Sequence, residues 1–399
     1  MFNRREINFL IALSGVYFTL TVDFMILMPL GPQLMRLLNI GAKEFSQLVS
    51  VYTLSAGLAG LAASVFLDRL DRKKALLLFL AGFAAGNVFC LTVTEFETLL
   101  FARAWTGLFT GFSGAAIFAI LSDAFAVEKR ATAFGVVLSS FALASLVGIP
   151  VALVLAKNFS WQTPFLFVFV CTVTVWAFSL ARLPSMTSHF GEAARTWASS
   201  FANLKLLVTG SDRVLTLSFM FFLVLGHFSL VPFLFPSIVA NGGISEASLP
   251  AVYIAGGLAS IVSSILFGRL ADRYGKRKIF TYCLLASLPV ILAVSTLGPS
   301  SAAWITFMVA SFFVVMGGRM APAMTLVTTG VSPETRGSFL SLMSSLQHLT
   351  TAVAAFVTGF IVIKTDDGKL LNFQYVGLLA VMCSLIALAL AYRFTNKEI

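Results

Sequence analysis

The chain has 399 residues, of which 58% are hydrophobic and only 11% are charged, and its formal net charge at pH 7 is +10. Soluble globular domains carry about 25% charged residues, so this composition excludes an ordinary water-soluble domain. Apolar stretches of about 20 residues, long enough to cross a bilayer as helices, recur along the whole length, whereas a transmembrane barrel would need shorter, alternating strands. The composition therefore predicts an all-α membrane protein.

Charge clusters and turn residues divide the chain into twelve apolar spans that we expect to be transmembrane helices. The first is too long for a signal-peptide core and contains Asp23, so we expect it to be retained. In chain order the spans are approximately residues 7–34, 47–67, 75–94, 98–122, 131–156, 162–182, 214–240, 248–268, 279–298, 302–329, 337–363 and 373–392.

The basic residues predict the orientation of these spans. With the N-terminus in the cytoplasm, most of the 27 Lys and Arg residues fall in cytoplasmic turns. This bias is the positive-inside rule, and it predicts a multi-pass inner-membrane protein with both termini in the cytoplasm. Because the basic residues are spread over short turns that face an anionic leaflet, the net charge implies no nucleic-acid partner. The basic residues left on the far side are Arg36, Lys43, Lys157, Lys364 and Lys369.

The chain also contains an internal repeat, which predicts two homologous six-helix halves at residues 1–182 and 213–399. The linker between them, residues 183–212, has an apolar rhythm that includes Trp197 and Phe201 and predicts an amphipathic helix on the cytoplasmic surface. The matches between the halves are residues 64–74 with 268–278, Asp23 and Pro32 with His227 and Pro236, and Glu128 and Arg130 with Glu334 and Arg336.

The turn after the second span resembles a motif of the major facilitator superfamily, Gly-x-x-x-Asp-Arg-x-Gly-Arg-Lys. Ser64 and Asp71 stand where that motif has glycines. The resemblance covers essentially the whole chain and, within the family, is to drug:proton antiporters with twelve spans. It implies the major facilitator fold, two pseudo-symmetric six-helix bundles. The matching residues are Asp68, Arg69, Arg72 and Lys73 in the first copy, and Gly268, Asp272, Arg273, Gly275 and Lys276 in the second.

These two turns are the expected cytoplasmic gate, although the same charges could serve only to orient the spans. A carboxylate at the end of the second span can lie against the positive N-terminus of the eleventh, while an arginine reaches the acid that ends the fourth, Asp123. The expected gate residues are Asp68, Arg69, Arg72, Asp123, Asp272, Arg273 and Lys276.

Asp23 is the only acidic residue expected deep in the membrane, and it is the leading candidate for a proton carrier. Burial favours the neutral form of a carboxylate, so such a group can bind a proton from one side and release it to the other. In the fourth span, Arg103 with Gly107 and Gly111 resembles a family motif associated with proton transfer. Asp23 could instead be a structural partner of Arg103, and Arg103 could extend outward to the membrane surface.

Three further features of the sequence each allow two interpretations. Gly148 and Pro150 in the fifth span resemble an antiporter motif that lacks its other glycines, and they suit either a gate or plain packing. His227, the counterpart of Asp23, is either a titrating cavity residue or a satisfied core histidine. Arg319 either attracts an anionic substrate or binds backbone carbonyls that Pro322 leaves free.

Together these features predict a proton-coupled secondary transporter that exports a small amphipathic solute or drug by alternating access. The alternatives are a spinster-like transporter of lysophospholipids or other lipids, and an exporter of sugars or metabolites. A receptor or an intramembrane enzyme is disfavoured, because no metal-ligand cluster, phosphate loop or nucleophile with a nearby base is recognisable. We expect no cofactor and no metal, only the proton as coupling ion. The expected partners of this monomer are a small-molecule or lipid-like substrate, protons and membrane lipid.

Overall fold

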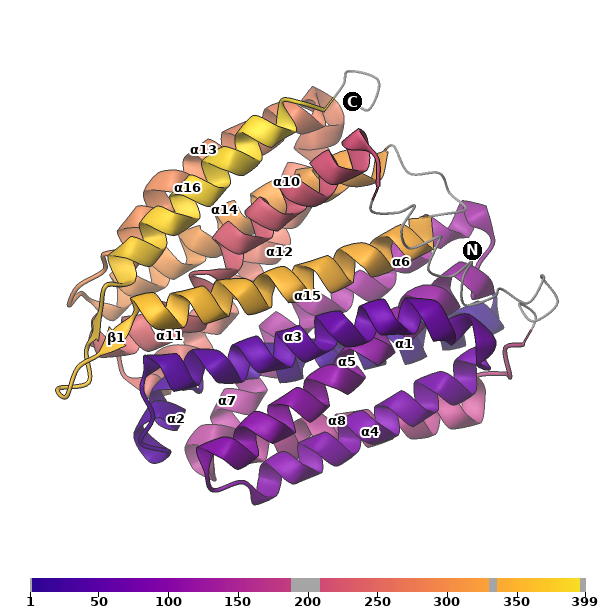
Figure 1. Cartoon of the computed structure of the whole chain (residues 1–399), viewed down its shortest axis with the longest axis horizontal. Coiled ribbons are helices and arrows are strands. Elements are labelled where there is room, and N and C mark those ends of the chain that lie inside the picture. The colour runs from indigo at the N-terminus through magenta and orange to yellow at the C-terminus, as the bar shows by residue number, and fades with distance from the viewer. Residues whose placement is uncertain (1, 188–208, 330–335, 395–399) are drawn as a thin grey trace.

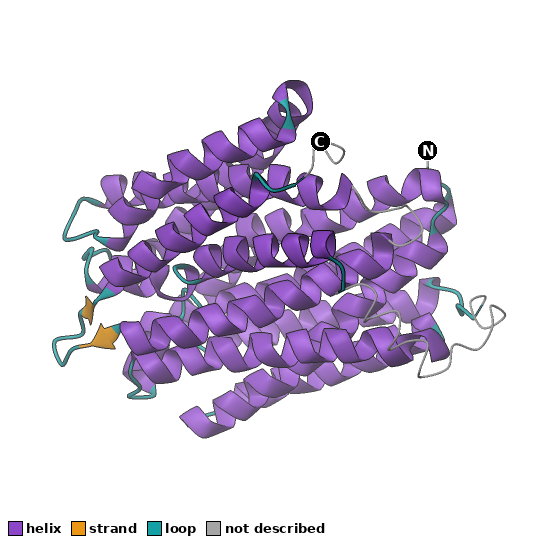
Figure 2. Ribbon diagram, turned by 45° about the horizontal axis from the view of Figure 1, so that its top comes forward, coloured by secondary structure: helices purple, strands orange, loops and turns teal. Residues whose placement is uncertain are grey.

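The structure is a computed structural model that describes residues 2–187, 209–329 and 336–394. It has twelve helical segments long and apolar enough to cross a membrane, which confirms the all-α fold and the expected number of spans. Figures 1 and 2 show these helices side by side in one bundle. Within the described residues, the only strands are β1 (Ile363–Lys364) and β2 (Leu370–Leu371), which pair antiparallel.

The helices follow the chain in two groups. The first group is α1 (Arg4–Ile26), α2 (Gly31–Leu37), α3 (Ala42–Phe66), η1 (Leu67–Arg69), α4 (Arg72–Thr92), α5 (Phe96–Ala124), α6 (Val127–Leu143), the π-helical turn η2 (Ala144–Gly148), α7 (Ile149–Asn158) and α8 (Thr163–Arg182). The second group is α10 (Ser211–Phe228), α11 (Val231–Ala240), η4 (Glu246–Ser248), α12 (Leu249–Tyr274), α13 (Lys276–Ser295), α14 (Ala302–Thr329), α15 (Arg336–Ile361) and α16 (Phe373–Ala391).

Three of the expected spans are interrupted. The first divides into α1 and α2, the fifth into α6, η2 and α7, and the seventh into α10 and α11. In each case a proline lies in the first turn of the later piece: Pro32, Pro150 and Pro232. Proline lacks the backbone N–H that a helix interior needs but fits the first turn, where that N–H has no helical partner. The prolines therefore mark where each span can begin a new helix.

The two ends of the bundle differ. Figure 1 shows both chain termini at one end and β1, α2 and α11 at the other, and we call these the terminus end and the hairpin end. At the hairpin end one apolar cluster joins residues of both groups, including Phe45 and Phe233. At the terminus end the second group has a separate cluster of buried residues, built around Phe219, Phe280 and Phe339, and from the first group Leu61 of α3 packs against it. The apolar core is thus shared at the hairpin end and divided at the terminus end.

The longest seam between the two groups is formed by α3 and α15, which lie along each other. Two glycines of α3 receive side chains of α15 there: a side chain added at Gly57 would meet Leu349, and one added at Gly60 would meet Ser345. Ser50 Oγ crosses the seam and donates to the carbonyl of Ala352 at 3.0 Å. Glycine and serine allow two helix backbones to approach closely inside a membrane.

Polar contacts tie the groups together at the hairpin end. Arg36, in the last turn of α2, forms an ion pair with Glu246 at 2.8 Å. Lys364, on β1, donates from Nζ to the carbonyls of Met35 at 3.1 Å and Ile40 at 3.2 Å, within and just beyond the end of α2. A lysine suits this position because the last carbonyls of a helix lack helical donors. The sequence predicted only on which side of the membrane Arg36 and Lys364 lie, and it did not predict their contacts between the two groups.

The proposed linker, residues 183–212, lies mostly outside the described residues, and so does its expected amphipathic helix around Trp197 and Phe201. Only its beginning, up to Thr187, and its end, from Thr209, are described. The domain limits at residues 182 and 213 therefore stay predictions.

Lys364→Met should open the hairpin end. The change removes two charge-assisted hydrogen bonds between the groups, and one such bond alone contributes about 1.5 kcal/mol or more, so the open population should rise at least tenfold. Spin labels on cysteines replacing Leu37 and Trp304, both exposed, would report the separation of α2 from α14 in a variant without the four native cysteines.

Lys369→Met is the matched control, because within the described residues the ion pair of Lys369 is with Asp367 of the same hairpin, at 3.5 Å. Equal distance distributions for Lys364→Met and Lys369→Met would show that the Lys364 contacts do not hold the two groups together.

Candidate functional site

A buried ion pair joins two of the expected site residues. Asp23 on α1 and Arg103 on α5 meet at 3.0 Å between Oδ1 and Nη1, and Nη2 also donates to the carbonyl of Asp23 at 3.2 Å. Their side chains are 0% and 1% exposed, so Arg103 does not extend to the membrane surface. The structure therefore brings together the two residues that the sequence singled out for proton transfer.

The surroundings of this pair are aromatic. The guanidinium of Arg103 lies 4.1 Å from the centroid of the Tyr52 ring and 5.9 Å from that of Phe165. The Tyr52 hydroxyl shares a 2.8 Å hydrogen bond with Thr110 Oγ1. Within the described residues, Asp23 Oδ2 and Arg103 Nε have no hydrogen-bond partner. One carboxylate oxygen thus stays open to a proton while the other holds the arginine.

Glycines bring the neighbouring helices close enough to build this environment. A side chain at Gly107 would overlap the carbonyl of Tyr52, and one at Gly111 would overlap the carbonyl of Ala56. The two glycines that follow Arg103 therefore set the spacing between α5 and α3, and with it the position of Tyr52. Backbones can approach this closely only where no Cβ intervenes.

Gly148 has a similar effect on the other side of α1. A side chain there would strike Val22, the neighbour of Asp23, so Gly148 lets η2 pack against α1. Pro150 lies in the first turn of α7, directly after this π-helical turn. Gly148 thus packs the fifth span against the helix that carries Asp23, which is the packing interpretation, and a part in gating stays a prediction for both residues.

His227 and Arg319 do not repeat the arrangement of Asp23 and Arg103. Arg319 is 0% exposed and donates from Nη1 to the hydroxyls of Ser384 at 2.9 Å and Ser287 at 3.4 Å. These are serine hydroxyls on α16 and α13 and not the backbone carbonyls near Pro322 that we expected. Within the described residues, Nε and Nη2 of Arg319 and Nδ1 of His227 have no hydrogen-bond partner. His227 packs against Phe228, with ring centroids 4.7 Å apart.

Phe24 and His348 belong to the same region, although the sequence analysis named neither. Phe24, next to Asp23, stacks on Tyr52 with centroids 6.0 Å apart and an angle of 18°. On its other sides it meets Phe228 of α10 at 6.0 Å and His348 of α15 at 6.3 Å. The aromatic residues around the ion pair therefore continue into the second group of helices.

The first expected gate turn forms a charge network. Arg72 binds Asp68 at 2.7 Å through Nη2 and Asp123 at 3.0 Å through Nε, so it connects the α3–α4 turn to the end of α5. The expected contact of Asp68 with the N-terminus of the eleventh span stays a prediction, because residues 330–335 and the side chains that begin α15 lie outside what the structure describes. Arg69 lies beside Asp68 in η1.

The second gate turn is organised differently. Arg273 lies over the ring of Tyr274 at 5.2 Å, and in the described part of the chain Asp272 makes no ion pair. Lys276 begins α13, and Gly275 before it has φ of +97°, a conformation that favours glycine. Within the described residues, Asp272 of the copy that is closer to the family motif therefore has no counterpart of the ion pair that Asp68 forms with Arg72.

Asp71, which replaces a motif glycine, has its own function in the first turn. It caps α4 by accepting from the amide of Lys73 at 2.9 Å, and it accepts from the amide of Met186 at 3.1 Å and from the Ser185 hydroxyl. Partial burial raises the pKa of this carboxyl, but these hydrogen bonds lower it more, so the pKa lies below its ordinary value. Asp71 thereby fixes the segment that follows α8.

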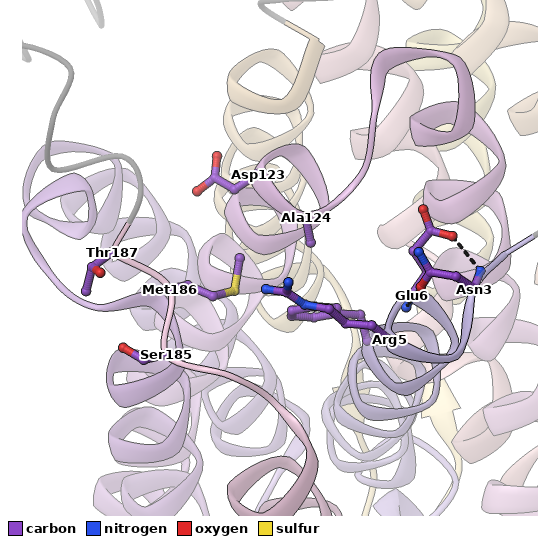
Figure 3. A pocket seen from close by; sticks show the side chains of 9 residues that line it. Asn3, Arg5, Glu6, Asp123, Ala124, Ser185, Met186 and Thr187 are labelled. Carbon is purple, nitrogen blue, oxygen red and sulfur yellow. Dashed lines mark hydrogen bonds between the residues drawn. The ribbon is translucent and has the colours of Figure 1, made fainter.

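A cavity of about 510 Å³ lies at the terminus end, beside this network. Figure 3 shows Arg5 reaching across it toward Met186, with Glu6 and Asn3 on one side and Asp123 on the other. The ion pair of Asp23 and Arg103 is not part of its lining. The lining residues are Asn3, Arg5, Glu6, Phe9, Asp123, Ala124, Ser185, Met186 and Thr187.

Sequence comparison matches this chain to known transporters. The family model described as Major Facilitator Superfamily matches residues 13–242 and 217–398. An uncharacterized MFS-type transporter of Bacillus subtilis is 24% identical over 88% of each chain. The Probable sugar efflux transporter of Mannheimia succiniciproducens is 21% identical over 85% of this chain and 82% of its own. Multidrug resistance protein 2 of B. subtilis is 22% identical over 99% of this chain and 97% of its own.

Solved structures show the same fold. A bacterial homolog of the human lysosomal transporter Spinster, in an inward-facing and unoccupied conformation, matches with a TM-score of 0.73 and 15% identity over 98% of this chain and 97% of its own. The nucleoside transporter NupG, as a D323A mutant, also matches with a TM-score of 0.73 and 15% identity, over 98% of this chain and 100% of its own.

Gly107→Ala should destabilise the protein and displace Tyr52. The added methyl overlaps the Tyr52 carbonyl, and overpacking of this kind costs about 1–3 kcal/mol. The melting temperature in detergent would measure the loss. Gly114→Ala on the same helix is the control, because a side chain there meets nothing within 4 Å. A melting temperature as low for Gly114→Ala as for Gly107→Ala would contradict close packing as the cause.

Asp71→Ala should release the segment at Ser185 and Met186. Hydrogen exchange at the Met186 amide would rise severalfold at pH 7, whereas Asp71→Asn keeps an acceptor oxygen and should stay closer to wild type. Because the pKa of Asp71 is lowered in the folded protein, its stabilisation is complete above the ordinary value of about 4 and is lost only as the pH falls through the lowered pKa. Equal protection in the alanine variant would mean that other contacts hold this segment.

Proposed function

The chain belongs to the Major Facilitator Superfamily, and on that premise we propose that it is a proton-coupled transporter that exports a small amphipathic solute or drug. The observation that carries this proposal is the buried pair of Asp23 and Arg103. An unpaired charge is costly inside a membrane, so a carboxylate that exchanges protons there needs a partner that compensates its ionised form. Arg103 is that partner.

Proton binding changes the balance of this pair. The proton adds to Oδ2 of Asp23, the oxygen that has no hydrogen-bond partner in the described structure. The carboxyl is then neutral, and its attraction for Arg103 falls to that of a neutral hydrogen bond. Conformations that differ in the arrangement of α1 and α5 therefore change in relative free energy, and their populations shift. Release of the proton toward the other side restores the pair and completes the cycle.

The division of the apolar core supports a state that is open toward the cytoplasm. The positive-inside rule assigns the terminus end to the cytoplasm, and there the second group of helices has a core of its own. The hairpin end, which would face outward, is tied by Arg36 and Lys364. We propose that solute enters between the groups from the cytoplasm and that these hairpin-end contacts break when the protein opens outward. The network of Asp68, Arg72 and Asp123 would then serve the cytoplasmic gate.

The names of two relatives support export as the direction, because one is described as a sugar efflux transporter and the other as a multidrug resistance protein. They also define the first compounds to test. A thermal-shift screen of purified protein against amphipathic drugs and sugars would identify a ligand, since binding to the native state raises its stability.

With a ligand in hand, Asp23→Asn should reduce uphill transport driven by a pH gradient to background. Asparagine has nearly the same shape as the protonated carboxyl but cannot release a proton, so ligand binding and downhill exchange should persist. Transport in proteoliposomes with and without a pH gradient measures both. Asp367→Asn, an exposed carboxylate in the hairpin, is the control and should behave as wild type. Accumulation of the ligand by the Asp23→Asn variant in a pH gradient would exclude Asp23 as the proton carrier.

A further inference from the structure

Four rings connect the ion pair to the second group of helices. Tyr52 lies under Arg103 at 4.1 Å, and Phe24 stacks on Tyr52 at 6.0 Å. Phe24 in turn contacts Phe228 on α10 and His348 on α15. The path therefore runs from the guanidinium of Arg103 through two rings of the first group to two rings of the second.

Protonation of Asp23 leaves Arg103 with a charge to be stabilised. A guanidinium keeps its proton in proteins, so Arg103 stays cationic when its partner becomes neutral. Its remaining polar contacts in the described structure are the backbone carbonyl of Asp23 and a neutral hydrogen bond to Oδ1 of the carboxyl. The faces of Tyr52 and, farther away, Phe165 are then the groups that can stabilise the cation. A cation over an aromatic face is attracted by the quadrupole of the ring, and the attraction is strongest in a desolvated site.

We propose that Tyr52 is a positioning residue for proton uptake: its ring holds the cationic Arg103 while Asp23 is protonated, and Phe24 links that event to α10 and α15. The proposal rests on the proposed function, because it requires Asp23 to be the proton carrier. Neither Tyr52 nor Phe24 takes the proton.

The sign of the effect follows from comparing the two states. When Asp23 is ionised, its charge already compensates Arg103, and the ring contributes little more. When Asp23 is protonated, its carboxyl offers Arg103 only a neutral hydrogen bond, so the ring contributes a larger share of the stabilisation of the cation. Removal of the ring therefore destabilises the protonated state more than the ionised state. More acid is then needed to reach the protonated state, so the pH response shifts to lower pH.

Several other titratable groups surround the pair and must be controlled. Those that face it or its aromatic neighbours are Tyr52 on α3, Cys90 on α4, His227 on α10 and His348 on α15. A histidine next to Phe24 or Phe228 could produce a pH response of its own, because its charge changes near neutral pH.

The test follows the distance between spin labels at Leu37 and Trp304 as a function of pH, so it needs no substrate. The protein is the full chain in lipid nanodiscs without its four native cysteines. In Tyr52→Leu, the midpoint of the distance change should move to lower pH by about one unit, the size expected for a desolvated cation–π contact. Tyr52→Phe keeps the ring and loses the hydroxyl, which bonds Thr110 and lies near Asp23, so its midpoint should not move to lower pH.

Two variants separate the failure of this inference from failure of the proposed function. In Asp23→Asn the distance should no longer depend on pH. A flat response in wild type, or a response that survives in Asp23→Asn and vanishes in His348→Gln, would overturn both. A flat response in Asp23→Asn with equal midpoints for Tyr52→Leu and Tyr52→Phe would overturn the function of Tyr52 alone. If Tyr52→Leu fails to fold, Tyr52→Met, an unbranched side chain without a ring, carries the same expectation.

Phe24 is tested by the size of the response and not by its midpoint. Phe24→Leu removes the stacking on Tyr52 and the ring contacts with Phe228 and His348, so the distance change between the labels should shrink at least twofold. Phe24→Trp keeps an aromatic face and should preserve most of it. An unchanged amplitude in Phe24→Leu would show that the event at Asp23 reaches the second group by another path.

Discussion

The arrangement of the first group of helices depends on one constraint, that two opposite charges must be held together without water. Neither Asp23 nor Arg103 is exposed, and each would be an uncompensated charge if the other were removed, at a cost of about 3–5 kcal/mol. The surrounding backbone is shaped to keep them in contact. Gly107 and Gly111 bring α3 close to α5, so that Tyr52 covers the guanidinium, and Gly148 lets η2 support α1 beside Asp23.

The sequence predicted the features that follow from its apolar composition and from the few charged residues that lie deep in the membrane. Twelve apolar stretches are sufficient to predict twelve spans, because the bilayer fixes their length. Asp23 and Arg103 could be paired in advance, since a lone deep acid and a deep arginine both need a partner. Tyr52 and Phe24 could not be chosen among 7 tyrosines and 40 phenylalanines. Their selection depends on how each helix is rotated about its axis, and apolar spans carry little periodic signal for that rotation.

The internal repeat was a weaker guide to the site than to the fold. The first gate turn departs from the family motif at Asp71, yet that residue caps α4 and holds the segment after α8. The second turn keeps the glycine, Gly275, with its positive φ, and its Asp272 makes no ion pair in the described structure. The partners of Arg319 are serine hydroxyls on α13 and α16, and the repeat did not predict them. The direction in which those serines point depends on side-chain packing, which the limits of the spans do not determine.

The seam between α3 and α15 has a mechanical consequence. Large side chains interlock as ridges and grooves, and a helix can leave such a fit only by jumping to the next register. Gly57 and Gly60 have no side chains, so Leu349 and Ser345 of α15 lie directly on the α3 backbone and no large side chain of α3 at these positions blocks them. One helix can then roll on the other through small rotations of these two side chains. The contacts of Arg36 and Lys364 at the hairpin end, and not the seam, would limit how far the two groups rock.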